Sequence, residues 1–172
     1  MHKIPRVLIV MGSDSDYHIV EPCVKLLNEF SVMTEVRICS AHRTPDITAE
    51  LARSAEAVGA DVIIAAAGKA AHLPGVLAAH TPLPVIGLPI KSDALSGLDA
   101  LLSMVQMPPG VPVATVAIDG AENAALLAIQ IISTRDAMLR NKVKEYKSAL
   151  VRKVEQKDKN LQEKLRTLYP LA

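Results

Sequence analysis

Five short apolar runs alternate with segments whose apolar residues recur at helical spacing, and this alternation restricts the fold more than any other feature. The runs cover residues 6–11, 34–39, 61–66, 84–88 and 113–118, and the run at 34–39 alternates apolar with polar residues. Apolar runs of this length are typical of strands buried on both faces of a parallel sheet. Strands that alternate with helices are joined by right-handed crossovers. The sequence therefore predicts an α/β fold with a central parallel sheet between two layers of helices.

The helices are predicted from apolar residues three or four positions apart. The expected apolar faces are Ile19, Val20, Cys23, Leu26, Leu27 and Phe30 in the first helix, Ile47, Leu51, Ala55 and Val58 in the second, and Leu98, Leu101, Leu102 and Val105 in the third. A further helix, rich in Ala and Leu, is expected from about residue 121. Residues 67–75 are predicted to form a loop of small residues that leads on to the fourth strand.

Three polar or glycine-containing loops, at 12–16, 40–45 and 67–75, each follow a predicted strand. The carboxyl ends of parallel strands lie at one edge of a sheet, which is where ligands bind in open α/β folds. We therefore expect the three loops to meet and to form a ligand site.

The second of these loops, Ser40-Ala41-His42-Arg43-Thr44-Pro45, carries the most chemistry. The guanidinium of Arg43 offers a fork of donors that matches a phosphate or a carboxylate, and Ser40 adds a hydroxyl. His42 can both give and take a proton near neutral pH. The simpler alternative is that His42 packs in a turn and that Arg43 is a solvated surface charge. The convergence of three loops favours a functional His42.

The other two loops support an anion site. In the first, Gly12 lets the backbone approach a ligand, while Ser13 and Asp16 lie where a helix begins, with Asp16 or a neighbour as the expected N-cap. The loop has neither the spacing of a Walker motif nor that of a Rossmann fingerprint. In the third loop, His72 is either a second functional imidazole or a packed, hydrogen-bonded one.

Composition excludes several classes of protein. With 172 residues, of which 50% are hydrophobic, the chain suits one globular domain with a sizeable core. One Phe, three Tyr and no Trp give no stacking platform for single-stranded nucleic acid, so a nucleic-acid partner is not expected. Cys23 and Cys39 lack the spacing of a metal site, and we expect both to be reduced and packed. No signal-peptide pattern or bilayer-length apolar run occurs, which predicts a cytoplasmic protein without a membrane partner.

The last part of the chain differs in charge and pattern. Residues 1–134 carry 8 basic and 13 acidic side chains, whereas residues 135–172 carry 11 basic and 5 acidic ones. From about residue 136, apolar residues recur at near-heptad intervals and predict one long amphipathic helix. We therefore expect a catalytic domain at 1–135 and a helical extension at 136–172, whose apolar stripe a neighbouring subunit covers.

Six segments together resemble one family. They are Met-Gly-Ser-Asp-Ser-Asp at 11–16, Ser-Ala-His-Arg-Thr-Pro-Asp at 40–46, Ala-Ala-His-Leu-Pro-Gly at 70–75, Ala-Leu-Ser-Gly-Leu-Asp at 94–99, Val-Gln-Met-Pro at 105–108 and Asn-Ala-Ala-Leu-Leu-Ala at 123–128. In this order they resemble the N5-carboxyaminoimidazole ribonucleotide mutases, class I of the PurE family. The resemblance covers about residues 6–135. It implies a flavodoxin-like or Rossmann-like three-layer sandwich, a homo-octamer, and a functional link to an ATP-dependent carboxyaminoimidazole ribonucleotide synthase.

The resemblance also implies an activity. These mutases are isomerases of purine biosynthesis that move a carboxylate from an exocyclic nitrogen to a ring carbon of an aminoimidazole ribonucleotide, without metal or organic cofactor. His42 matches the general acid and base. The remaining matched positions hold the substrate: Ser13, Ser40 and Arg43 at the phosphate, Asp16 at the ribose, and Gly68 and His72 in the loop over the ligand.

Three alternatives stay open. The first is a carboxylase that uses carbon dioxide directly, because Lys69 stands where these mutases usually have a glycine and where such carboxylases tend to have a basic residue. Those carboxylases, however, lack the His-Leu-Pro-Gly that this chain has at 72–75, which favours the mutase. A flavodoxin-like module could hold a phosphorylated ligand without chemistry. A metal-dependent hydrolase could use Asp14, Asp16, His42 and His72, although helix capping explains the two Asp residues equally well.

Overall fold

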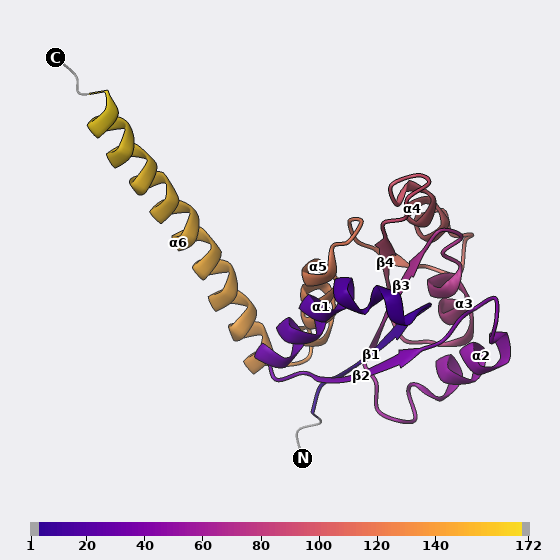
Figure 1. Ribbon diagram of the computed structural model, residues 1–172. Helices are drawn as coiled ribbons and strands as arrows, with labels where there is room; N and C mark the ends of the chain where they lie inside the picture. Colours follow the sequence, from indigo (N-terminus) through magenta and orange to yellow (C-terminus); the bar gives the residue numbers. More distant parts are fainter. Residues whose placement is uncertain (1–3, 170–172) are drawn as a thin grey trace. The chain divides into compact units, whose positions relative to one another are not determined.

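The computed structural model describes residues 4–169 and contains a five-stranded, wholly parallel sheet (Figure 1). In the sheet the strands lie in the order β2-β1-β3-β4-β5. Their bounds are β1 Arg6–Met11, β2 Met33–Ile38, β3 Val62–Gly68, β4 Val85–Ile90 and β5 Ala114–Thr115. Each predicted strand is present, although β5 is much shorter than residues 113–118. The predicted α/β fold with a parallel sheet is therefore confirmed.

Burial follows position in the sheet. β3 and β4 are buried over almost their whole length, whereas the edge strand β2 is partly exposed. The strand order β2-β1-β3-β4-β5 is that of flavodoxin-like sheets. In these sheets β2 is added on one side of β1 and β3 on the other, so the order of the strands reverses between β1 and β3. The ends of β1 and β3 therefore diverge into loops on opposite faces of the sheet. This switch point is where a ligand site is expected.

Helices cover both faces of the sheet (Figure 1). Those of the sheet-containing part are α1 Tyr17–Glu29, α2 Pro45–Ser54, α3 Leu73–His80, α4 Leu98–Val105 and α5 Ala121–Ser133, together with the short 3-10 helix η1 Asp14–Asp16. α2, α3 and α4 bury residues against one side of β1, β3 and β4 in a single core cluster. Figure 1 shows α1 and α5 on the other side. The three-layer sandwich predicted from the sequence is therefore present.

Helix α3 contradicts the expectation of a continuous loop at 67–75. The loop ends at His72, and Leu73–His80 is helical, with Pro74 in the first turn. Proline is tolerated there because its missing N–H would have no intrahelical partner. Leu73, Pro74 and Leu77 are buried, so packing on the sheet stabilises this short helix.

The apolar faces predicted for α2 and α4 are only partly buried. Ile47 is 60% exposed and Leu98 49% exposed. The fully buried residues of these helices are instead Thr48 and Ala52 in α2, and Ala100 and Met104 in α4. The buried face of each helix is therefore displaced from the predicted one. The exposed members of the predicted faces are Ile47, Val58, Leu98, Leu102 and Val105.

The two cysteines are free and buried, as predicted. Cys23 lies on the buried face of α1, and its burial raises the pKa of the thiol to about 12. Cys39 follows β2, where its Sγ lies 2.8 Å from Oγ1 of Thr48.

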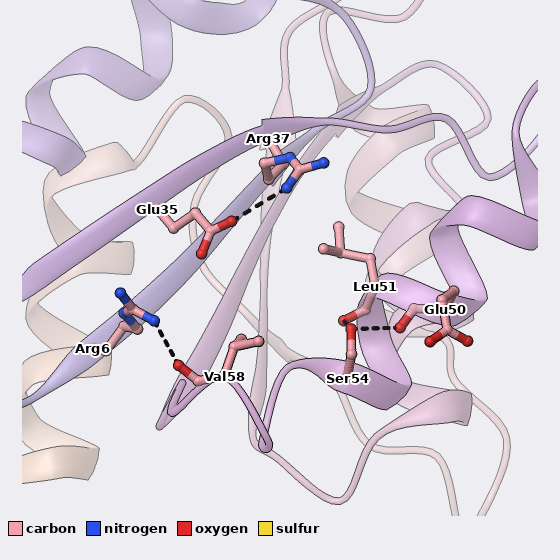
Figure 2. Close-up of polar contacts among 7 residues, drawn as sticks. All are labelled: Arg6, Glu35, Arg37, Glu50, Leu51, Ser54 and Val58. Carbon is pink, nitrogen blue, oxygen red and sulfur yellow. Dashed lines mark hydrogen bonds and ion pairs between the residues drawn. The ribbon is translucent and has the colours of Figure 1, made fainter.

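Polar contacts hold the amino-terminal edge of the sheet (Figure 2). The backbone N–H of Arg6 donates to Oδ2 of Asp61 at 3.0 Å. The Arg6 guanidinium donates to the carbonyl of Val58, the contact that Figure 2 shows. These bonds join the start of β1 to the segment that enters β3. On α2, the Ser54 hydroxyl donates to the carbonyl of Glu50 at 2.8 Å.

The described residues form two compact units that divide after Ile132. The second unit contains α6, Ala137–Leu168, the long helix predicted from residue 136 (Figure 1). Asp136 caps it by accepting a hydrogen bond from the N–H of Leu139 at 3.0 Å. None of the helices within residues 4–169 combines the length and apolar character that crossing a bilayer requires. Residues 1–3 and 170–172, at the outer ends of the predicted domain and extension, lie outside the described residues.

Candidate active site

A cleft of about 640 Å³ opens at the carboxyl ends of β1 to β4. Its lining comes from the ends of four strands and the segments that follow them: Gly12, Ser13, Ser15 and Asp16 at β1; Ser40, Ala41, His42 and Arg43 at β2; Ala67, Gly68, Lys69, Ala70 and Leu73 at β3; and Ile90, Lys91, Ser92 and Asp93 at β4. The predicted convergence of three loops is therefore confirmed. The size suits a small organic ligand such as a nucleotide.

The loop after β2 is closed by the side chain of Thr44. Its hydroxyl accepts the N–H of Ser40 at 3.0 Å and donates to the carbonyl of Ser40 at 3.0 Å. The N–H of Thr44 also donates to the carbonyl of Ser40, at 2.8 Å. These three bonds form a compact turn with Ala41, His42 and Arg43 between its ends, and α2 begins at the next residue.

Arg43 joins the second loop to the first. Its guanidinium donates to the carbonyl of Gly12 at 3.2 Å, and its backbone N–H donates to the hydroxyl of Ser40 at 3.2 Å. The Gly12 bond uses one of five guanidinium donors, so further donors can reach an anion in the cleft. Arg43 is exposed to that cleft.

Asp16 occupies the predicted N-cap position of α1, but the capping side chain in the first loop is that of Ser13, which caps η1. The Ser13 hydroxyl accepts from the N–H of Ser15 at 3.3 Å, whereas Asp16 makes no side-chain capping bond to α1. The Asp16 carboxylate instead accepts from the Ser15 hydroxyl at 3.2 Å. Partial burial raises the pKa of Asp16, against smaller lowering effects of the Ser15 hydrogen bond and of His18. The carboxylate is thus left at the cleft with capacity for ligand hydroxyls.

The imidazole of His42 meets that of His72. Nε2 of His42 lies 2.8 Å from Nδ1 of His72, and the rings pack edge to face with centroids 5.0 Å apart. His72 occupies the N-cap position of α3 without making a side-chain capping bond. Its imidazole is therefore neither packed away nor used as a cap. Both imidazoles are exposed, and His42 lines the cleft.

The loop after β3 turns sharply between Gly68 and His72. A Cβ at Gly68 would lie 3.3 Å from the carbonyl oxygen of Ile90, a contact tighter than most side chains make. Lys69 has a φ of 56°, in the left-handed region. The N–H of Ala71 then donates to the carbonyl of Lys69, and the N–H of His72 to that of Ala70, both at 2.8 Å. These tight turns carry the chain from β3 to His72.

The predicted site residues are largely together. Ser13, Asp16, Ser40, His42, Arg43 and Gly68 line the cleft, and His72 contacts His42. Sequence reasoning missed the contribution of the loop after β4, of which Lys91 and Asp93 are part, although a polar Lys-Ser-Asp run after the fourth strand was a visible signal.

The metal-site alternative lacks a ligand set. Within residues 4–169, no three His, Cys, Asp or Glu side chains are arranged to hold a metal ion. The carboxylate of Asp14 accepts from the hydroxyl of Ser13 and the N–H of Ser15. Asp14 therefore has a structural role within its own turn.

The chain is similar to known proteins of one family. Residues 6–153 match the family model described as AIR carboxylase. The chain is 58% identical over 149 residues to the N5-carboxyaminoimidazole ribonucleotide mutase of Pyrococcus abyssi, covering 87% of this chain and 86% of that protein. It is 52% identical to the mutase of the same name from Thermotoga maritima, covering 93% and 94% of the two chains.

A solved structure shares the fold along nearly its whole length. The crystal structure of Treponema denticola PurE superposes with a TM-score of 0.84 at 32% identity, covering 91% of this chain and 98% of that chain. Because the family model spans most of the chain and curated relatives exceed 50% identity, this chain belongs to the AIR carboxylase family.

Proposed function

We propose that this protein is an isomerase of purine biosynthesis that converts N5-carboxyaminoimidazole ribonucleotide to 4-carboxy-5-aminoimidazole ribonucleotide. Two relatives that cover most of the chain at over 50% identity carry the name of this mutase. The observation that carries the proposal is the contact between His42 and His72 in a nucleotide-sized cleft that also contains Arg43. One cleft thus combines a proton-transfer group with an anion-binding group.

His42 is the proposed general acid and base. In the first half-reaction the bond between the exocyclic nitrogen and the carboxyl carbon breaks, carbon dioxide departs, and protonated His42 gives a proton to the nitrogen. In the second, the ring carbon forms a bond to the carbon dioxide, and neutral His42 takes the proton that this carbon loses. The two steps together neither gain nor lose a proton, since His42 ends in the protonation state in which it started. A group that titrates near neutrality suits both steps.

The phosphate of the substrate is proposed to bind where Ser13, Ser40 and Arg43 meet. The Arg43 guanidinium donates to the carbonyl of Gly12, next to Ser13, and the Arg43 N–H donates to the hydroxyl of Ser40. These bonds bring the three side chains together. Asp16 is proposed to accept from the ribose hydroxyls, because its carboxylate lines the same cleft. Gly68 and His72 are proposed to lie over the imidazole ring of the substrate, since the segment that carries them follows the neighbouring strand β3.

The larger assembly is also proposed. We infer that the protein is a homo-octamer whose subunits are joined in part by the extension at 136–172, since apolar side chains of α6, such as Val154 and Leu161, are more than half exposed. Cytoplasmic location and a functional link to the ATP-dependent synthase that would make its substrate stay predictions. Catalysis without metal or organic cofactor is likewise part of the proposal.

The competing function is a carboxylase that uses aminoimidazole ribonucleotide and carbon dioxide directly. The test supplies the purified protein either with N5-carboxyaminoimidazole ribonucleotide or with aminoimidazole ribonucleotide and bicarbonate at physiological concentration. The mutase predicts much faster formation of the 4-carboxy product from the first substrate. Faster conversion of the second would establish the carboxylase instead, and no conversion of either would support a binding module.

A further inference from the structure

Lys69 has a backbone conformation that does not suit a lysine. Its φ of 56° is in the left-handed region, where a Cβ is crowded by the following carbonyl and where glycine is the usual residue. The turn from β3 to His72 requires this conformation, as the bonds from Ala71 to Lys69 and from His72 to Ala70 show. Glycine would make the same turn without strain. The geometry of the turn therefore does not account for a lysine here.

The side chain of Lys69 has a clear location. It lines the cleft, is exposed, and has no hydrogen bond or ion pair to another side chain within residues 4–169. Strained residues that structure alone does not require occur often at ligand sites. Because no side chain of the described residues pairs with the ammonium, it is available to an anionic group in the cleft.

The position of Lys69 separates it from the proposed phosphate site. Arg43 lies on the loop after β2 and contacts the loop after β1, whereas Lys69 lies on the loop after β3, three residues before His72. The sheet order sets β3 on the far side of β1 from β2. The two cations therefore reach the cleft from different loops, and Lys69 belongs to the loop that also carries His72.

We propose that the ammonium of Lys69 binds the carboxylate that the reaction moves. The inference rests on the proposed function, in which the ligand has two anionic groups, a phosphate and a carboxylate next to the proton-transfer group. Lys69 donates hydrogen bonds to the carboxylate and makes no covalent bond. It is thereby a specificity residue that favours the carboxylated nucleotide over the uncarboxylated one.

The test measures binding of two ligands, 4-carboxy-5-aminoimidazole ribonucleotide and aminoimidazole ribonucleotide, by calorimetry. All proteins carry His42→Asn, so that the ligands are not converted. Lys69→Met removes the charge and keeps an unbranched side chain, while Lys69→Gly removes both the charge and the backbone strain. Lys91→Met is the matched control, because Lys91 lines the same cleft and loses the same charge.

Lys69→Met and Lys69→Gly should each bind the carboxylated nucleotide about tenfold more weakly and the uncarboxylated one within about twofold of the parent, as expected for loss of one charge-assisted hydrogen bond. Lys69→Gly should also melt at a higher temperature than Lys69→Met, which shows that the loss is not due to unfolding. Lys91→Met should not distinguish the two ligands. Equal weakening of both ligands by Lys69→Met, unchanged binding, or the same selectivity loss in Lys91→Met would each overturn the assignment.

Failure of the proposed function would look different. In that case the protein with native His42 would not form the 4-carboxy nucleotide from N5-carboxyaminoimidazole ribonucleotide at all. If native turnover is present and the Lys69 variants keep their preference, only the role of Lys69 is wrong.

Discussion

Nε2 of His42 lies 2.8 Å from Nδ1 of His72, although the two residues are 30 positions apart in the chain. One nitrogen of this pair carries the proton and the other accepts it, so the tautomer of each ring depends on that of its neighbour. The first ring comes from the turn closed by Thr44 and the second from the start of α3. Two loops must therefore be correctly folded before either imidazole is aligned.

His42→Asn should abolish turnover while nucleotide binding is retained. An amide can donate to Nδ1 of His72 but cannot shuttle a proton, so we expect kcat to fall about a hundredfold or more. Steady-state kinetics and calorimetric binding of the product nucleotide measure the two effects. His80→Asn is the matched control, because His80 is exposed at the end of α3 and does not line the cleft. Substantial activity in His42→Asn would exclude His42 as the acid and base.

Arg43→Met should chiefly raise KM. The variant loses a charge-assisted contact to phosphate worth about 2 kcal/mol, which corresponds to roughly a thirtyfold weaker interaction. Arg53→Met is the control, since Arg53 is exposed on α2 and pairs with Glu50. An unchanged KM in the Arg43 variant would mean that the phosphate binds elsewhere.

Thr44→Val should lower kcat more than it raises KM. Valine keeps the shape of threonine but cannot bond to the N–H and carbonyl of Ser40, so the turn that carries His42 loosens. Thr44→Ser keeps the hydroxyl and should retain most activity. The comparison of kcat and KM in the two variants tests this positioning role. Equal activity of the Val and Ser variants would show that backbone bonds alone hold the turn.

Asp16→Asn should stabilise the protein at neutral pH while weakening nucleotide binding. Burial raises the pKa of Asp16 above its usual value of 3.8, so the folded protein retains this proton where the unfolded chain has lost it. Stability therefore falls as the pH rises from 3.8 through the raised pKa. In urea unfolding at acidic and neutral pH, the stability of the variant should therefore lack this fall with rising pH. A variant less stable than the parent at neutral pH would contradict the predicted direction of the stability change.

Val154→Lys together with Leu161→Lys should reduce the size of the assembly. Both residues are on one face of α6, where they are 66% and 51% exposed, and lysine would oppose their burial against a neighbouring subunit. The control is Gln156→Lys with Thr167→Lys, which adds the same charge to the opposite face of the helix. Sedimentation velocity reports the assembly. If both pairs sediment like the parent, this stripe does not join subunits.

Most of the architecture could be predicted from local pattern. The runs that became β1, β3 and β4 are mostly apolar, and the run that became β2 alternates apolar with polar residues. The repeat from residue 136 predicted α6 because helical periodicity depends on neighbouring residues only. The convergence of the loops with His42 and Lys69 was also predictable, since parallel strands end at the same edge.

Other features depended on contacts between distant parts of the chain. Leu73-Pro74-Gly75 was predicted as loop, yet burial of Leu73 and Leu77 against the sheet makes it the start of α3. Ile47 and Leu98 were predicted to be buried, but the buried faces of their helices carry Thr48 with Ala52, and Ala100 with Met104.

The sequence by itself determined the parallel α/β fold, the long last helix and the group of loops that carries the candidate site, because each follows from short-range periodicity and turn chemistry. Only the tertiary structure decided that Nε2 of His42 meets Nδ1 of His72 and that Lys69 adopts a left-handed turn at the cleft. These relationships depend on crossovers that bring residues about 30 positions apart to within hydrogen-bonding distance. A local pattern contains no information about such distances.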